Sequence, residues 1–181
     1  MIRGIRLESL KVEKEKEHRK ISPEELREMV MSVTNLRARA IILLQMKLGL
    51  RAGEVANLRL EDIHMNDADS STEYSELATH PELSSRQNLV YIPSRDDRRG
   101  NKSVRPRLLP LDSETRATLD RYLFARPDNG EPWVFLSKKS HTKLTTKGVN
   151  QIWKDAFHPE YAETDEYRAV TSHFGRHRFT T

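Results

Sequence analysis

The chain has 181 residues, 36% of them hydrophobic and 32% charged, and a formal net charge of +4. This length supports one domain with its own hydrophobic core and is short for two. No apolar run approaches the roughly 18 residues that a membrane-spanning helix requires. The absence of cysteine excludes both a disulfide framework and a thiolate metal site.

The charges are unevenly distributed along the chain. Residues 95–107 hold six basic side chains against two acids, and residues 137–147 hold four lysines and no acid. Residues 66–85 hold five acids and neither Lys nor Arg. Such sorting can present one positive face to a polyanion. Chance variation among solvated loops explains it equally well at this point.

The N-terminal part predicts a charged extension followed by a helix. Residues 1–20 have alternating charges and few apolar side chains, which indicates a solvated helix or a linker. Ser22 and Glu25 have the spacing of a capping box, and Pro23 stands at the first helical position. Apolar residues at helical spacing follow from Leu26. A helix should therefore begin at residue 23.

A second helix should begin after Asn35 and end at Gly49. Its apolar residues cover most of the circumference, so it should lie at the centre of the core. A short helix is predicted within RAGEVANLRLEDI, residues 51–63. A long polar loop should then run to about Asn88, and loops of that length are usually mobile or functional.

The next stretch predicts a β-hairpin. NLVYIP and SVRPRLLPL are rich in strand formers, and the turn-rich SRDDRRGNK separates them. Pro106 and Pro110 place the second arm at a sheet edge, since proline cannot donate a ladder hydrogen bond.

The C-terminal part predicts two more helices and a strand. Asp112 should cap one helix, residues 133–136 should form a short buried strand, and Thr145 or Thr146 should begin the other helix. The fold class is therefore α+β, mostly α-helical, with a small antiparallel β-sheet at one edge.

Three stretches place strong cations beside a turn or a helix start. They contain Arg51, Arg99 with Lys102, and His173 with Arg176. Each signal is weak alone, because a single surface arginine is common. His173 and His177 have a spacing that zinc ligands use, but neither acids nor thiols accompany them, so a metal site is disfavoured.

In their order and spacing these stretches resemble the catalytic domain of the tyrosine recombinases, the phage integrase family. The resemblance covers nearly the whole chain from Ser22. LGLRAGEVANLRLEDI resembles the first family box, RRGNKSVRPRLLPL the hairpin box, FLSKKSHTKLTTKGV the element between them and the end, and HFGRH the His-x-x-Arg-His box. Each match is weak by itself, and chance agreement of all four in order is improbable.

The resemblance implies cleavage and rejoining of DNA through a 3′-phosphotyrosyl intermediate, with no metal and no cofactor. Arg51 and Arg176 would clamp the phosphate, because guanidinium donors match the charged oxygens of the transition state. His173 would handle the nucleophile's proton. Glu54 would orient Arg51 from the same helical face. His177 would support the site, and a packing role fits it at least as well.

The hairpin departs from the family pattern. The family's general-acid lysine lies one or two residues before the turn glycine, where this chain has Arg98 and Arg99. Arginine is a poor general acid because it does not deprotonate in proteins. Lys102 is then the candidate catalytic acid. Further DNA contacts are expected from the basic stretches: Arg98, Arg99, Arg105, Lys138, Lys139, Lys143 and Lys147.

Residues 21–181 would form this domain, incomplete at the C-terminus. In the family the nucleophilic tyrosine follows the His-x-x-Arg box, but all five tyrosines here precede it. We therefore expect this chain alone neither to cleave nor to join DNA. Its partners would be double-stranded DNA and, in the full-length protein, further recombinase protomers. The location would be cytoplasmic and nucleoid-associated in a prokaryote or phage, with the acidic loop 66–85 away from DNA or disordered.

Two alternatives remain open. The chain could be a non-catalytic DNA-binding module that competes with a full-length recombinase. It could also be a helical protein-interaction domain, which would show no salt-sensitive affinity for duplex DNA.

Overall fold

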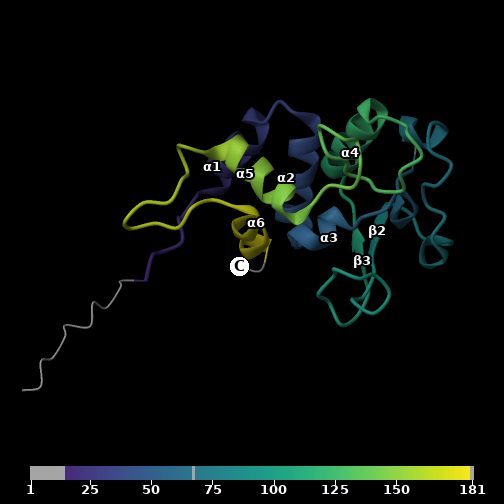
Figure 1. Cartoon of the computed structure of the whole chain (residues 1–181), viewed down its shortest axis with the longest axis horizontal. Coiled ribbons are helices and arrows are strands. Elements are labelled where there is room, and N and C mark those ends of the chain that lie inside the picture. The colour runs from purple at the N-terminus through teal and green to yellow at the C-terminus, as the bar shows by residue number, and fades with distance from the viewer. Residues whose placement is uncertain (1–14, 67, 180–181) are drawn as a thin grey trace, which may run out of the picture.

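The computed structural model describes residues 15–66 and 68–179. Figure 1 shows a helical body with the small sheet at one side. The helices are α1 (Pro23–Ser32), α2 (Leu36–Leu48), α3 (Ala52–Ala56), α4 (Ser113–Ala125), α5 (Thr146–Phe157) and α6 (Ser172–Phe179). The strands are β1 (Ile63–His64), β2 (Leu89–Ile92) and β3 (Arg107–Pro110), with short 3-10 turns at Leu60–Asp62, Asp69–Thr72 and Pro81–Leu83. The predicted α+β class is confirmed.

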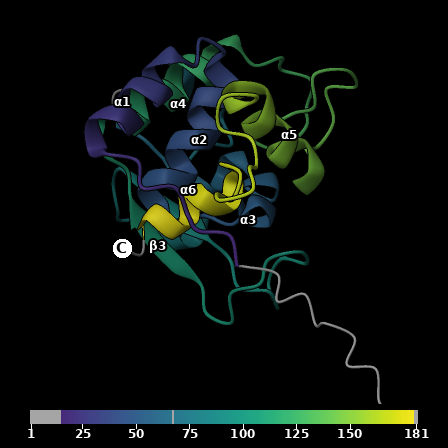
Figure 2. The same cartoon turned by 90° about the vertical axis from the view of Figure 1, so that its left-hand side faces the viewer.

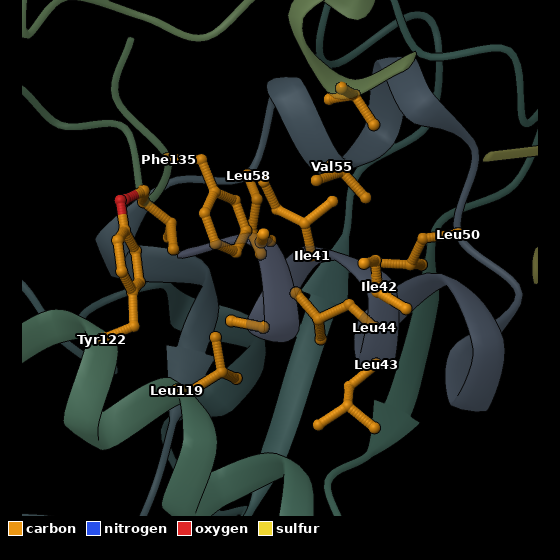
Figure 3. Packing of buried hydrophobic residues seen from close by; sticks show 14 of the residues in the cluster. Ile41, Ile42, Leu43, Leu44, Leu50, Val55, Leu58, Leu119, Tyr122 and Phe135 are labelled. Carbon is orange, nitrogen blue, oxygen red and sulfur yellow. The ribbon is translucent and has the colours of Figure 1, made fainter. Parts of the chain in front are cut away.

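The second helix is central, as its apolar circumference predicts. Ile41, Ile42 and Leu44 have no exposed surface. They pack among side chains that include Leu119 of α4 and Phe135 (Figure 3). Helices α1, α3, α4, α5 and α6 all contact α2. The three helices that border the candidate site, α3, α5 and α6, are thus packed directly onto α2.

Local capping explains where the first two helices begin. The Ser22 hydroxyl accepts a hydrogen bond from the Glu25 backbone N–H at 3.1 Å, and the Asn35 side chain accepts one from Ala38 at 2.9 Å. Both bonds satisfy N–H groups that the first helical turn leaves unpaired. Helix α2 ends at Gly49, whose φ of 64° is accessible mainly to glycine. This residue turns the chain directly into the predicted functional motif.

The sheet is antiparallel, in the order β1-β2-β3. Val90 of β2 lies between Ile63 and Leu109. Strand β3 is an edge strand, as its prolines predict. Strand β1 is short and was not predicted, because its two residues carry too little pattern to be distinguished from a loop.

One expectation needs correction. Residues 133–136 are not a strand: Val134, Phe135 and Leu136 are buried, but the segment makes only isolated bridges, Arg59 with Trp133 and Leu136 with Lys143. Residues 1–20 were expected to form a helix or a linker. Residues 15–20 are not helical and run beside Tyr167, which leaves the linker, and residues 1–14 lie outside the described part of the chain. Of the two expectations for the acidic loop, disorder does not apply where the loop is described, because the Tyr74 hydroxyl donates to backbone carbonyls at the end of α4.

Helix α6 was also not predicted as an element. It lies against α2 and close to α3 (Figure 2). Its sequence, SHFGRHRF, is short and has a weak apolar periodicity. Tertiary packing therefore decides its conformation. No helix among the described residues is long and apolar enough to cross a lipid bilayer.

Candidate active site

The separate motifs converge on one open cleft of about 410 Å³. It is bordered by the start of α3, the turn between β2 and β3, α5 and α6. The four predicted catalytic residues all line it: Arg51, Lys102, His173 and Arg176. A larger hollow of about 910 Å³ lies between α6 and residues 15–18, but both of its cationic side chains are already paired, Lys16 with Glu163 and Arg168 with Glu15. The smaller cleft is therefore the better candidate.

Arg51 lies at the N-terminus of α3. It is the N-cap residue of that helix, and its backbone N–H donates to the Glu54 carboxylate at 2.8 Å. Its Nη1 approaches Ser103 Oγ at 3.1 Å and Glu54 Oε1 at 3.4 Å. The Nε and Nη2 atoms have no hydrogen-bond or ion-pair partner among the described residues. These two nitrogens carry three N–H donors, which can receive a ligand.

Glu54 is the acidic centre of this side of the cleft, and its side chain has no exposed surface. Besides Arg51, it accepts a hydrogen bond from Ser103 Oγ at 2.8 Å and pairs with Arg107 Nη2 at 2.8 Å. Burial raises the pKa of Glu54, but the Arg51 backbone bond, the Ser103 bond and the charge of Arg107 together lower it below its usual value. The carboxylate is thus ionised at neutral pH. The expected contact between Glu54 and Arg51 is present.

Arg176 reaches the cleft from α6. Its Nη1 donates to the carbonyl of Gly49 at 2.8 Å, which ties it to the loop that also carries Arg51. Burial lowers the pKa of Arg176, and the positive charge of Arg51 lowers it further. The guanidinium of Arg176 is thus close enough to Arg51 to be repelled by its charge. An anion between them would relieve this repulsion.

The position of α6 depends on Gly175. A Cβ there would lie 2.7 Å from two ring carbons of Trp153 on α5. The Trp153 indole in turn donates to Gln45 of α2 at 2.6 Å. Glycine therefore allows the close approach of three helices that brings His173 and Arg176 to the cleft.

The two histidines of α6 differ in position. His173 is exposed and lines the cleft. His177 is one turn further on, and its ring centroid lies 5.6 Å from that of His173 and 4.9 Å from that of His18. It does not line the cleft. No group of three or more His, Asp or Glu side chains in the described ranges could hold a metal ion.

The hairpin turn presents Lys102 to the cleft. Gly100 has a φ of 100°, and a Cβ there would lie 2.8 Å from the Asn57 amide. Asn57 Nδ2 donates to Asn101 Oδ1 at 2.9 Å, and Asn101 Nδ2 donates to the Pro93 carbonyl at 2.8 Å. These contacts fix the turn against α3. Lys102 itself is exposed, so its ammonium can reach a bound ligand.

None of the seven residues expected to make further DNA contacts lines the cleft. The exposed ones are Arg99, Arg105, Lys138, Lys139 and Lys147. Lys143 is only partly exposed: its Nζ lies 4.0 Å from the centre of the Trp133 ring and donates to Asn57 Oδ1. Burial, and then the charges of Arg59 and Arg98, lower the pKa of Lys143.

Arg98 is not a surface cation. Its side chain is 9% exposed and pairs with the buried carboxylate of Asp62, with Nη2 to Oδ1 at 3.1 Å. A buried carboxylate needs such a partner. The expectation that Arg98 is available to DNA is therefore at odds with the structure. The sequence does not reveal this pairing, because the two residues are far apart in the chain.

The chain belongs to the phage integrase family, whose model matches residues 19–181. It is 28% identical to tyrosine recombinase XerA of Pyrococcus horikoshii over 163 residues, which cover 89% of this chain and 46% of that protein. It is 30% identical to tyrosine recombinase XerD of Caulobacter vibrioides over 118 residues, or 62% of this chain and 36% of the relative. The chain thus spans about half the length, or less, of these relatives.

Solved structures have the same fold. The crystal structure of XerA recombinase matches with a TM-score of 0.62 at 18% identity, over 92% of this chain and 49% of that one. The Tn1549 transposon integrase in complex with transposon right end DNA matches with a TM-score of 0.62 at 14% identity, over 91% and 52%. A lambda integrase tetramer bound to a Holliday junction gives 0.58 at 15% identity, over 92% and 42%.

Proposed function

We propose that this chain is the phosphate-binding part of a site-specific DNA recombinase, and that its cleft receives one phosphodiester of double-stranded DNA. The observation that carries the proposal is the convergence of Arg51 and Arg176 on one cleft. These residues are far apart in the sequence and are tied to the same loop. Their free donors suit the paired oxygens of a phosphate.

The reaction assigns a role to each cleft residue. A tyrosine hydroxyl attacks the phosphorus and forms a 3′-phosphotyrosyl bond, while the bond to the 5′-oxygen breaks. The two arginines stabilise the negative charge that grows on the non-bridging oxygens. His173 takes the proton of the attacking hydroxyl, and Lys102 gives a proton to the leaving 5′-oxygen. Rejoining is the same exchange in reverse.

The attacking hydroxyl does not come from the described structure. All five tyrosines lie in the described ranges, and none lines the cleft. Tyr74 and Tyr122 are buried and donate to backbone carbonyls. This chain by itself should therefore bind DNA without cutting it. A suicide substrate that traps covalent adducts should give none, and an adduct would overturn this assignment.

The partners follow from the same chemistry. The basic side chains around the cleft would contact further phosphates of a duplex in the cytoplasm. The lambda integrase match is a tetramer on a junction, and we extend this arrangement to the protein that contains this chain as a proposal. Further protomers would assemble with it on DNA.

Duplex binding tests the proposal directly. Fluorescence anisotropy with a short labelled duplex should show an affinity whose logarithm falls linearly with the logarithm of salt concentration. Arg51→Gln and Arg176→Gln should each weaken binding by roughly tenfold and reduce the slope by about 0.9. Arg116→Gln, on α4, is the control, because Arg116 does not line the cleft. Binding that is absent, or insensitive to salt, would favour a protein-interaction domain instead.

A further inference from the structure

Arg107 contacts the same buried carboxylate as Arg51, yet it does not line the cleft. It is the first residue of β3, its side chain is 30% exposed, and its Nη2 lies 2.8 Å from Glu54 Oε1. This short approach is a charge contact and not an aligned hydrogen bond. In the sequence, Arg107 is the last of the six basic residues in the stretch 95–107.

Glu54 Oε1 has three neighbours, and their distances differ. Ser103 Oγ and Arg107 Nη2 both lie at 2.8 Å, whereas Arg51 Nη1 lies at 3.4 Å. Arg107 thus neutralises the negative charge of Glu54 from a shorter distance than the guanidinium of Arg51 does. The other oxygen, Oε2, accepts only the backbone N–H of Arg51 among the described residues. The carboxylate therefore holds the Arg51 backbone tightly and its side chain loosely.

We propose that Arg107 is a positioning residue that neutralises Glu54, so that the Arg51 guanidinium stays available to a phosphate. The inference rests on the proposed function and deepens it. Without Arg107, the nearest cation to the buried carboxylate is Arg51, and the pair would form a two-pronged ion pair. A phosphate would then have to compete with Glu54 for the same donors. With Arg107 present, that competitor is already satisfied.

The alternative is that Arg107 contacts phosphate directly. A double substitution distinguishes this direct contact from the positioning role. Arg107→Gln should weaken duplex binding by roughly tenfold and reduce the salt slope by about 0.9, because one phosphate contact is lost. Adding Glu54→Gln removes the competing carboxylate and should restore both quantities. Arg107→Lys keeps the charge and should bind like the unchanged chain.

The matched control uses a nearby exposed arginine. Arg105 lies on the same hairpin and is expected to contact DNA directly. Glu54→Gln combined with Arg105→Gln has the same net charge as Glu54→Gln combined with Arg107→Gln. The double variant with Arg105→Gln should still bind the duplex weakly, and only the double variant with Arg107→Gln should regain the affinity of the unchanged chain. Equal recovery of both pairs would mean that net charge alone is measured, and it would overturn the proposal. No recovery of either pair would assign Arg107 to direct contact and overturn it too.

A second measurement needs no DNA and so separates this proposal from the proposed function. In a crystal structure of the Arg107→Gln variant, the distance from Arg51 Nη1 to Glu54 Oε1 should shorten from 3.4 Å to below about 3 Å. An unchanged distance would refute the positioning role, whatever the DNA affinity. If Arg107→Gln does not fold, Arg107→Lys and the double variant decide, since both must bind like the unchanged chain. An unchanged chain that binds no duplex would refute the proposed function alone.

Discussion

The two arginines that border the cleft are held in opposite ways. Arg51 belongs to a polar network in which Arg51, Ser103 and Arg107 all contact one oxygen of the buried Glu54 carboxylate. Among the described residues, Arg176 has one backbone carbonyl as its hydrogen-bond partner, and it owes its place to the packing of α6 on α2 and α5. The position of Arg51 is determined by ion pairs and hydrogen bonds, and the position of Arg176 by the close packing of helices.

The contrast predicts different failures. A polar network is sensitive to charge and pH, whereas a packed helix is sensitive to side-chain volume. Substitutions on the packing side should therefore disturb stability and binding together. Substitutions on the network side should change binding while the fold persists.

The largest effect is expected from Gly175→Ala. A Cβ at 2.7 Å from the Trp153 ring must push α6 away from α5, and overpacking of this kind costs about 1–3 kcal/mol. The usual gain of about 1 kcal/mol from alanine in a helix offsets only part of it. Chemical denaturation should show the loss, and duplex affinity should fall to the level of Arg176→Gln. Lys154→Ala, an exposed change on α5, should stay within about 0.5 kcal/mol. Unchanged stability would show that shape does not place Arg176.

A smaller effect is expected at the hairpin turn, which depends on both polar contacts and close packing. Asn57→Ala removes the donor to Asn101 Oδ1, whose side chain is buried, and leaves that oxygen unpaired at a cost of about 1–3 kcal/mol. Denaturation measures this cost directly. Asn129→Ala removes an exposed amide contact and should cost under about 0.5 kcal/mol. Equal effects of the two changes would mean that Asn57 does not hold the turn.

The helices, their caps and their packing could be predicted from the sequence better than the ion pairs and hydrogen bonds around Arg51. The caps at Ser22 and Asn35, the central position of α2 and the edge placement of β3 all follow from local pattern, and each is confirmed. The motifs of the four candidate catalytic residues are contiguous in sequence, and the structure brings these residues to one cleft. Their roles stay predictions.

The partners of those residues were harder to predict. Ser103 and Arg107 meet Glu54 across a long stretch of chain, and Asp62 meets Arg98 in the same way. Ion pairing of this kind depends on tertiary geometry, which leaves no periodic signal in the letters. The same limit applies to α6, whose helix is decided by contacts with α2 and not by its own propensity.

The smallest effect is expected in the pH dependence of stability. The pKa of Glu54 is lowered in the folded chain, so its charged form stabilises the fold above the unfolded pKa of about 4.3. This contribution is lost as the pH falls through the lower, folded pKa. The net shift is limited because burial opposes the hydrogen bonds and the Arg107 charge. Glu54→Gln lacks the titration, so its free energy of unfolding should decline less steeply below about pH 4 than that of the unchanged chain.

Denaturant titrations of both proteins between about pH 3 and 7 would measure this difference. Glu163→Gln serves as the control, because its carboxylate is on the surface and its ion pair in the described part of the chain is with Lys16. A surface pair is screened by solvent and should leave the acid limb almost unchanged. Parallel curves for Glu54→Gln and the unchanged chain would mean that the carboxylate gains nothing from its neighbours. The network around Arg51 would then be held by geometry, as Arg176 is, and the distinction between the two sides of the cleft would disappear.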